Sequence, residues 1–162
     1  MAEDEQAAQN DGEKIIIQVQ KVFIKDVSFE TPNSPQIFTL AWKPKLAFEI
    51  SSQSRALEDD LYEVVLILTA TVKVEDSTAY LAEIHQGGIF HIKGFEPEAL
   101  QKTLHVFCLR VLYPYACAAV WDLVNKGGFP QLNLAPMNFT LLYEQGLKTA
   151  QEEHAASDTQ QH

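Results

Sequence analysis

Few residues in this sequence have the types and spacing that chemistry requires. The two cysteines, Cys108 and Cys117, stand at no metal-ligand spacing from histidine or acid. The glycine pairs Gly87-Gly88 and Gly127-Gly128 lack the flanking pattern of a phosphate-binding loop. No serine nucleophile elbow, paired catalytic acids or Cys/His signature is present. The histidines are expected to be ordinary surface or core residues; they are His85, His91, His105, His154 and His162. The sequence therefore predicts no enzyme, no metal site and no cofactor.

The balance of charge restricts the class of partner. The formal net charge is −10 and the pI is near 4.8. Nucleic acids and anionic membrane surfaces require clustered Lys and Arg, so both are excluded as partners. No run approaches the ~18–20 apolar residues of a membrane span, and the acidic N-terminus has no secretory-signal pattern. We expect a cytoplasmic protein, not inserted in a membrane, whose negative surface suits basic partners.

A long hairpin from Leu61 to Ile92 is predicted to be the scaffold. In its first strand every even position, from Tyr62 to Val74, is apolar or aromatic, whereas the odd positions are mixed. Because side chains alternate across a strand, one face should be covered and the other partly wet. Glu75-Asp76-Ser77 supplies the turn. Gly87-Gly88 in the second strand indicates a bulge or a close approach of another backbone segment.

Two further strands complete a predicted antiparallel sheet. Ile15 to Lys25 is the first and continues extended to Glu30, and Lys45 to Ile50 is the second. Between them, Ile37 to Trp42 follows a Pro-rich loop and is expected to cross over on the surface. Ser51 to Asp60 is polar and is expected to be turn-like. Four antiparallel strands need at least one helical cover, which makes an α+β protein.

Two helices should supply that cover. Glu96-Pro97-Glu98 starts the first, and apolar residues then recur at three- and four-residue spacing as far as Leu123. Pro114 lies inside this stripe and should kink or restart the helix. Asn138 is a plausible N-cap for the last helix. The predicted domain is 15–150, flanked by a disordered acidic tail over 1–14 and a disordered tail over 151–162.

Several separated motifs, taken together, resemble the SecB family of bacterial protein-export chaperones. They are Lys25 to Glu30, Gln86 to Phe90, Tyr113 to Ala116 and Phe129 to Phe139, in that order. The resemblance covers about Ile15 to Gly146. It implies an α+β subunit with a four-stranded antiparallel sheet, and a long kinked helix and a C-terminal helix packed on one face. It also implies a homotetramer, a dimer of dimers, that holds unfolded secretory preproteins without ATP and delivers them to SecA, the ATPase motor of the translocase.

The resemblance also implies roles for individual residues. An acidic SecA contact is expected at Asp26, Glu30, Leu81 and Glu83; the even spacing within each pair puts its members on one face, and the alternative is a solvated sheet face. Preproteins are expected to bind an apolar groove of Phe23, Trp42, Leu46, Phe48, Ile50, Tyr80 and Tyr143, for which the alternative is core packing. Ala82, Ile84 and Gln86 are expected at the tetramer interface, with interior hairpin packing as the alternative.

Two other functions stay open at this point. The aromatic set could line a closed cavity for a lipid or metabolite in a small-ligand-binding α+β protein, which would be smaller than a tetramer. A chaperone of the same fold could instead serve a toxin–antitoxin system, and the sequence cannot separate that role from general export.

Overall fold

The computed structural model describes residues 12–159, and most of the predicted N-terminal tail lies outside this range. The elements in chain order are β1 (Ile16–Glu30), the short 3-10 helix η1 (Gln36–Thr39), β2 (Pro44–Ala56), β3 (Leu61–Val74), β4 (Ser77–Lys93), α1 (Pro97–Lys102), the π-helical segment η2 (Thr103–Phe107), α2 (Cys108–Lys126) and α3 (Phe139–Thr159). The predicted α+β architecture, with four strands, a long helix and a C-terminal helix, is confirmed.

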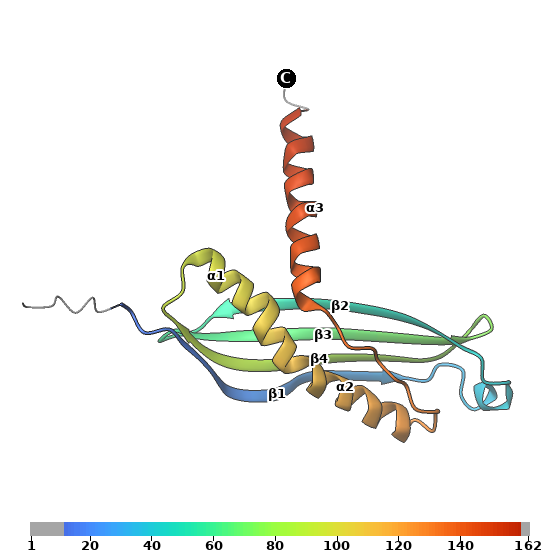
Figure 1. Ribbon diagram of the computed structural model, residues 1–162. Coiled ribbons are helices and arrows are strands. Elements are labelled where there is room, and N and C mark those ends of the chain that lie inside the picture. Colours follow the sequence, from blue (N-terminus) through green and yellow to red (C-terminus); the bar gives the residue numbers. More distant parts are fainter. Residues whose placement is uncertain (1–11, 160–162) are drawn as a thin grey trace, which may run out of the picture.

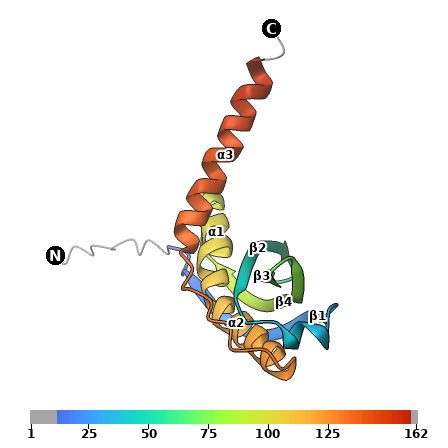
Figure 2. The same ribbon diagram turned by 90° about the vertical axis from the view of Figure 1, so that its right-hand side faces the viewer.

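The strands form one antiparallel sheet in the order β1-β4-β3-β2. The β3–β4 hairpin is therefore central, as its alternation predicts, and β1 and β2 are the two edges. All helices lie on one side of the sheet (Figures 1 and 2). We call the face that they cover the inner face and the opposite one the outer face. The inner face carries the even-numbered residues of β3 and β4, which are almost all buried.

The core lies between the inner face and the long helix. Leu66, Ile84 and Phe90 of the hairpin are fully buried with Leu112 and Val120 of α2. Both cysteines are free and buried in the same layer, as small hydrophobes. Burial raises the pKa of the Cys108 thiol to about 12 and also raises that of Cys117, so neither is a thiolate near neutral pH.

The glycine pair of β4 provides close approaches rather than a bulge. A Cβ on Gly87 would lie 2.5 Å from the ring of Phe23, and a Cβ on Gly88 would lie 2.6 Å from Phe90 and 2.9 Å from Leu112. The irregularities of the sheet are instead in β1, between Val19 and Lys21 and between Ile24 and Asp26, and at the β3–β4 turn. Glycine is required here because aromatic rings lie on both faces of the strand.

Two sequence-based expectations about individual segments were wrong, and a third was met in part. Residues 51–56 are not turn-like but continue β2 as far as Ala56, opposite Tyr62; their polar composition suits the half-solvated edge of a sheet. The crossover segment is not wholly on the surface, because Ile37 is buried in the core. Of the two outcomes expected at Pro114, a restart does not occur, because Pro114 is exposed and lies within α2; the long helix instead changes direction along its length (Figure 1). It also contains an irregular turn, η2, where Cys108 N–H donates to the Thr103 carbonyl.

The C-terminal helix also extends further than expected. α3 reaches Thr159, so the tail predicted from Gln151 is helical up to that residue, and residues 160–162 lie outside the described range. Helix-forming Ala, Gln and Glu dominate this stretch, which is exposed from Gln151 to Ser157, so an apolar stripe is not needed for it to be helical. Only the beginning of α3 contacts the helical layer; the rest projects from the body (Figure 1).

By length and composition, the helix over Pro97–Lys126 could cross a membrane. Half of its most apolar window is, however, buried inside the molecule. That burial is the ordinary pattern of a core helix.

Candidate functional site

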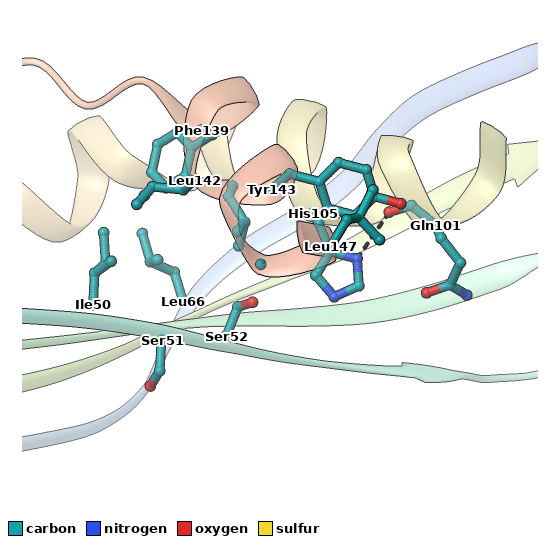
Figure 3. Close-up of a pocket in the computed structure, with 12 residues that line it drawn as sticks. Ile50, Ser51, Ser52, Leu66, Gln101, His105, Phe139, Leu142, Tyr143 and Leu147 are labelled. Carbon is teal, nitrogen blue, oxygen red and sulfur yellow. Dashed lines mark hydrogen bonds between the residues drawn. The ribbon is translucent and has the colours of Figure 1, made fainter. Parts of the chain in front are cut away.

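A cavity of about 540 Å³ lies between edge strand β2 and the helices (Figure 3). β2 and β3 form its floor, η2 with its neighbouring turns forms one wall, and the first turns of α3 form the other. Its lining is mainly apolar and consists of Ile50, Ser51, Ser52, Leu66, Gln101, His105, Leu109, Phe139, Leu142, Tyr143, Gly146 and Leu147. An open, mainly apolar cavity of this size can accept large side chains.

Local structure explains how α3 comes to cover this cavity. Asn138 caps the helix as predicted, since the Leu141 N–H donates to its Oδ1 at 3.0 Å. The cap directs Phe139 into the core, where its ring meets Tyr113 edge to face at a centroid distance of 5.6 Å. Tyr143, one turn later, stacks on His105 of η2. The His105 ring is oriented by a 2.8 Å hydrogen bond between Nδ1 and the Gln101 carbonyl (Figure 3).

A second, smaller cavity of about 70 Å³ lies further along β2. Its walls come from the crossover segment, the start of β2 and the loop after α2; they are Trp42, Pro44, Leu46, Val72, Tyr80, Pro130, Gln131 and Leu132. Phe129 supports it from beneath, with ring centroids 5.8 Å from Trp42 and 4.9 Å from Tyr80. Burial raises the pKa of Tyr80 to about 12, so its hydroxyl stays neutral at physiological pH.

The structure brings six of the seven predicted groove residues to one side of the sheet. Leu46, Phe48 and Ile50 form a row on the inner face of β2, opposite Val72, Ala70 and Leu68. Trp42 and Tyr80 lie at one end of the row, in the smaller cavity, and Tyr143 lies at the other end, in the larger one. Tyr80 is almost fully buried, so it belongs to the floor.

Phe23 is the exception among the groove residues. It pairs with Gly87 and covers it, whereas neighbouring Gly88 faces Leu112 of the long helix. Since successive residues point to opposite faces, Phe23 lies on the outer face. Phe23 therefore does not lie beside the apolar row of β2, and its role in preprotein binding stays a prediction. A bulge in β1, which sequence alternation does not show, changes which residues of β1 share a face.

Sequence reasoning did not predict most of the walls of the larger cavity, although the helical spacing of the residues that form them is visible in the sequence. Gln101, His105 and Leu109 recur every four residues, and Phe139, Leu142, Tyr143, Gly146 and Leu147 follow one stripe of α3. Both sets were available as helix faces, but only the fold shows that the two faces meet over β2.

The four residues of the predicted acidic contact lie together on the outer face. Glu30 is opposite Leu81 and Asp26 is opposite His85 on neighbouring strands β1 and β4. Glu83, opposite Ser28, accepts hydrogen bonds from the His85 ring at 2.6 Å and from the Thr69 hydroxyl at 3.4 Å. Among the described residues 12–159, the helices α1, α2 and α3 all lie on the other side of the sheet (Figure 2). This acidic patch, formed by Asp26, Glu30, Leu81 and Glu83, thus presents three carboxylates beside one apolar side chain.

The residues expected at a subunit interface are in the interior of this chain. Ala82 and Ile84 are 0% exposed on the inner face, and Gln86 donates from Nε2 to the Phe23 carbonyl at 2.8 Å. Their side chains therefore pack within their own subunit, as the alternative interpretation held. A role in assembly stays a prediction, and it would act through the core rather than by direct contact.

Within the part of the chain that the structure describes, no three or more His, Cys, Asp or Glu residues are grouped as metal ligands. Comparison with known proteins decides the family. The model of the preprotein translocase subunit SecB matches residues 9–150. The chain belongs to the SecB family.

Curated relatives in the SecB family match over nearly the whole chain. The protein-export protein SecB of Methylococcus capsulatus is 53% identical over 135 residues, which cover 83% of this chain and 87% of that protein. The SecB proteins of Marinobacter nauticus and Nitrosococcus oceani are 45% and 44% identical, and the matches cover 100% and 96% of this chain and 100% and 98% of theirs.

A solved SecB-like structure has the same fold. It is the SecB-like chaperone of Mycobacterium tuberculosis in complex with a ChAD peptide from the HigA1 antitoxin. The two chains superpose with a TM-score of 0.64 at 16% identity, covering 75% of this chain and 90% of that one. At that identity the likeness concerns the fold alone.

Proposed function

We propose that this protein is an ATP-independent holdase that binds unfolded preproteins along β2, keeps them competent for translocation and delivers them to SecA. The observation that carries the proposal is the apolar row of Leu46, Phe48 and Ile50 with a cavity at each end. From Leu46 to Ser52 the strand spans roughly 20 Å, at about 3.3 Å per residue, which matches a short stretch of extended chain.

The chemistry of such a groove suits many clients. An unfolded chain exposes apolar and aromatic side chains, and burying them is worth roughly 25 cal/mol per Å². β2 is an edge strand, so its outer backbone groups are available for hydrogen bonds to an extended client. Main-chain bonding does not depend on sequence, and two mainly apolar cavities select only for large side chains. Weak and tolerant binding of this kind is what a holdase requires.

Assembly into a homotetramer is part of the proposal, because it multiplies weak sites. The support is apolar surface at the other edge of the molecule. On the inner face of β1, Ile17, Val19, Ile24 and Val27 are each between 39% and 53% exposed, and Phe107, Tyr115 and Trp121 of the long helix are also exposed. Contiguous apolar surface of this kind is ordinarily covered by a partner, here a second copy of the chain.

SecA delivery is assigned to the outer face. Asp26, Glu30 and Glu83 place three carboxylates on the same face as Leu81, which is directly opposite Glu30, and α1, α2 and α3 lie on the other side of the sheet. Such a surface attracts a basic partner and raises the rate of encounter. The proposal also holds that the protein acts in the cytosol, without catalytic activity and without nucleic acid.

The direct test is suppression of aggregation. A secretory precursor unfolded in denaturant is diluted into buffer with or without the protein, in the absence of nucleotide, and light scattering is followed. Scattering should fall as the molar ratio of protein to precursor rises. Unchanged aggregation at a fourfold excess of subunits would contradict the holdase function.

Two alternatives give different results. A small-ligand-binding protein would be a stable monomer in native mass spectrometry and would not capture the unfolded precursor. A chaperone dedicated to a toxin–antitoxin system, as the solved structural neighbour suggests, would prefer an antitoxin peptide. Competition between such a peptide and a precursor for the groove measures that preference.

A further inference from the structure

Edge strand β1 contains an irregularity just before its acidic residues. Its ladder with β4 pairs Phe23 with Gly87 and Ile24 with Gln86, and it then resumes with Asp26 opposite His85. Lys25 is the extra residue. One extra residue in one strand shifts the alternation of all that follow by one position, so every later side chain changes face.

That shift decides which residues of β1 form the outer face. After the bulge, Asp26, Ser28 and Glu30 lie on the outer face, opposite His85, Glu83 and Leu81. Val27 and Phe29 lie on the inner face, where Phe29 packs with Tyr80 at a centroid distance of 5.7 Å. With regular pairing from Phe23 onward, both acids would point toward the helices. The acidic patch therefore exists only because Lys25 is bulged.

The Lys25 side chain is held by a buried carboxylate on another strand. Its Nζ lies 2.9 Å from Oε1 of Glu63 on β3, so the side chain reaches past β4. The second oxygen of Glu63 accepts from Nε of Arg55, directly opposite on β2, at 2.6 Å. Glu63 is only 7% exposed, and the three charged groups line one outer-face cavity with Gln53, Ser54 and Val65.

The energetics favour one position for Lys25. The hydrogen bond from Lys25 lowers the pKa of Glu63 more than burial raises it, so the carboxylate stays ionised at neutral pH. A buried carboxylate that loses a cation is strongly unfavourable. With regular pairing, Lys25 would lie opposite His85, so its side chain would have to reach Glu63 from a different position on β1. The cost of leaving the Glu63 carboxylate with Arg55 alone, instead of two cations, thus opposes loss of the bulge.

We propose that Glu63 and Lys25 are positioning residues for the outer face: their ion pair holds the β1 bulge and so keeps Asp26 and Glu30 on the same side as Glu83. The inference rests on the proposed function in one respect, since it takes the outer face to be the SecA-docking surface. The part of the inference that concerns strand register does not depend on which partner binds the outer face.

The direction in which Lys25→Met changes SecA affinity distinguishes this positioning role from a simple effect of charge. Lys25→Met removes a positive charge from an acidic surface, so by charge alone it would leave attraction for a basic partner unchanged or stronger. If Lys25 positions the acids, the same substitution weakens docking. Lys21→Met is the matched control: Lys21 is exposed, lies on the same strand and face opposite Ile89, and forms no ion pair with any described residue.

The experiment uses the full chain and two readouts. SecA affinity is measured by calorimetry for wild type, Lys25→Met, Lys25→Arg, Lys21→Met and Glu63→Gln. We expect roughly tenfold weaker binding for Lys25→Met and Glu63→Gln, recovery in Lys25→Arg and no loss in Lys21→Met. In methyl-labelled protein, the cross-strand contact between Val27 and Ile84 reports the register. It should weaken in the same two variants.

Each result has one interpretation. Wild-type affinity and an intact Val27–Ile84 contact in both Lys25→Met and Glu63→Gln would overturn the inference. If the wild type does not bind SecA, the docking function fails, and the methyl contact alone then decides whether the pair holds the bulge. Glu63→Gln keeps the shape of the side chain, so it provides the test if Lys25→Met does not fold.

Discussion

The rings of His105 and Tyr143 are stacked, with centroids 5.7 Å apart and planes 23° apart. Together with the buried Phe139, this contact joins α3 to the helical layer. From Glu144 to Ser157 the side chains of α3 are exposed. The stack therefore positions the wall of the larger cavity and, together with Phe139, holds the base of a helix whose remaining side chains, from Glu144 to Ser157, are exposed.

Replacing Tyr143 should weaken client capture without changing the fold. Tyr143→Ala removes an aromatic wall and the stack on His105, and such ring contacts are worth about 0.5–1.5 kcal/mol beyond their area, or about two- to tenfold in affinity. Titration of an unfolded, fluorescently labelled precursor measures the change. Leu141→Ala is the control, since Leu141 is exposed on the same helix and does not line the cavity. Equal losses in both variants would mean that the ring has no specific role.

Two glycines should respond in opposite directions to the same substitution. Gly88→Ala places a methyl group 2.6 Å from Phe90 and 2.9 Å from Leu112 inside the core, which should destabilise the protein by about 1–3 kcal/mol. Gly146→Ala lies in α3 with nothing within 4 Å, and it should be neutral or stabilising by up to about 1 kcal/mol. Denaturant midpoints at equal protein concentration compare the two. A neutral Gly88→Ala would show that the core can rearrange around the strand.

The sequence contained enough to predict the scaffold and the apolar row of the groove. Period-two alternation identifies the β3–β4 hairpin, and it also puts Leu46, Phe48 and Ile50 on one face. The spacing of Asp26 with Glu30, and of Leu81 with Glu83, predicts that each pair shares a face. That the two pairs share the same face depends on the register of β1 against β4, which only the structure provides.

What sequence reasoning could not predict depends on contacts between distant segments. Phe23 and Asp26 are an odd number apart, so without the bulge at Lys25 they would lie on opposite faces, whereas the bulge puts both on the outer face. Phe23 also lies on β1, at the edge of the sheet opposite to β2 and its groove. Lys25, Arg55 and Glu63 come from three strands, and no local pattern links them. The extension of α3 was missed for another reason, because an unpacked helix has no apolar periodicity to detect.

The pH dependence of stability should include a contribution from Glu63. Its folded-state pKa is lowered, so the stabilisation by its ion pairs is fully present above the pKa of the unfolded chain. It is lost as the pH falls from the ordinary glutamate range through the lower folded-state value. Thermal melts of the wild type should therefore shift downward on acidification over that range.

Removing the titratable group tests this assignment. Glu63→Gln should cost about 1–3 kcal/mol at pH 7, because the charge-assisted hydrogen bonds weaken, and the variant should lose less stability on acidification than the wild type. Glu144→Gln, at an exposed position of α3, should do neither. Parallel acid profiles for Glu63→Gln and the wild type would assign the acid sensitivity to other carboxylates.

Reversing the charge of Glu83 should separate docking from client capture. Glu83→Lys replaces a carboxylate beside Leu81 on the outer face, whereas the groove along β2 opens on the inner face. SecA affinity should fall about tenfold or more, and the remaining binding should depend less on salt, because a screened attraction has been lost. Glu144→Lys makes the same change of net charge on α3, away from the outer face, and should leave SecA affinity near that of the wild type. Native mass spectrometry with an unfolded precursor completes the comparison: if Glu83→Lys reduces assembly and capture together with SecA binding, the substitution has damaged the sheet and the outer face is not a separate docking surface.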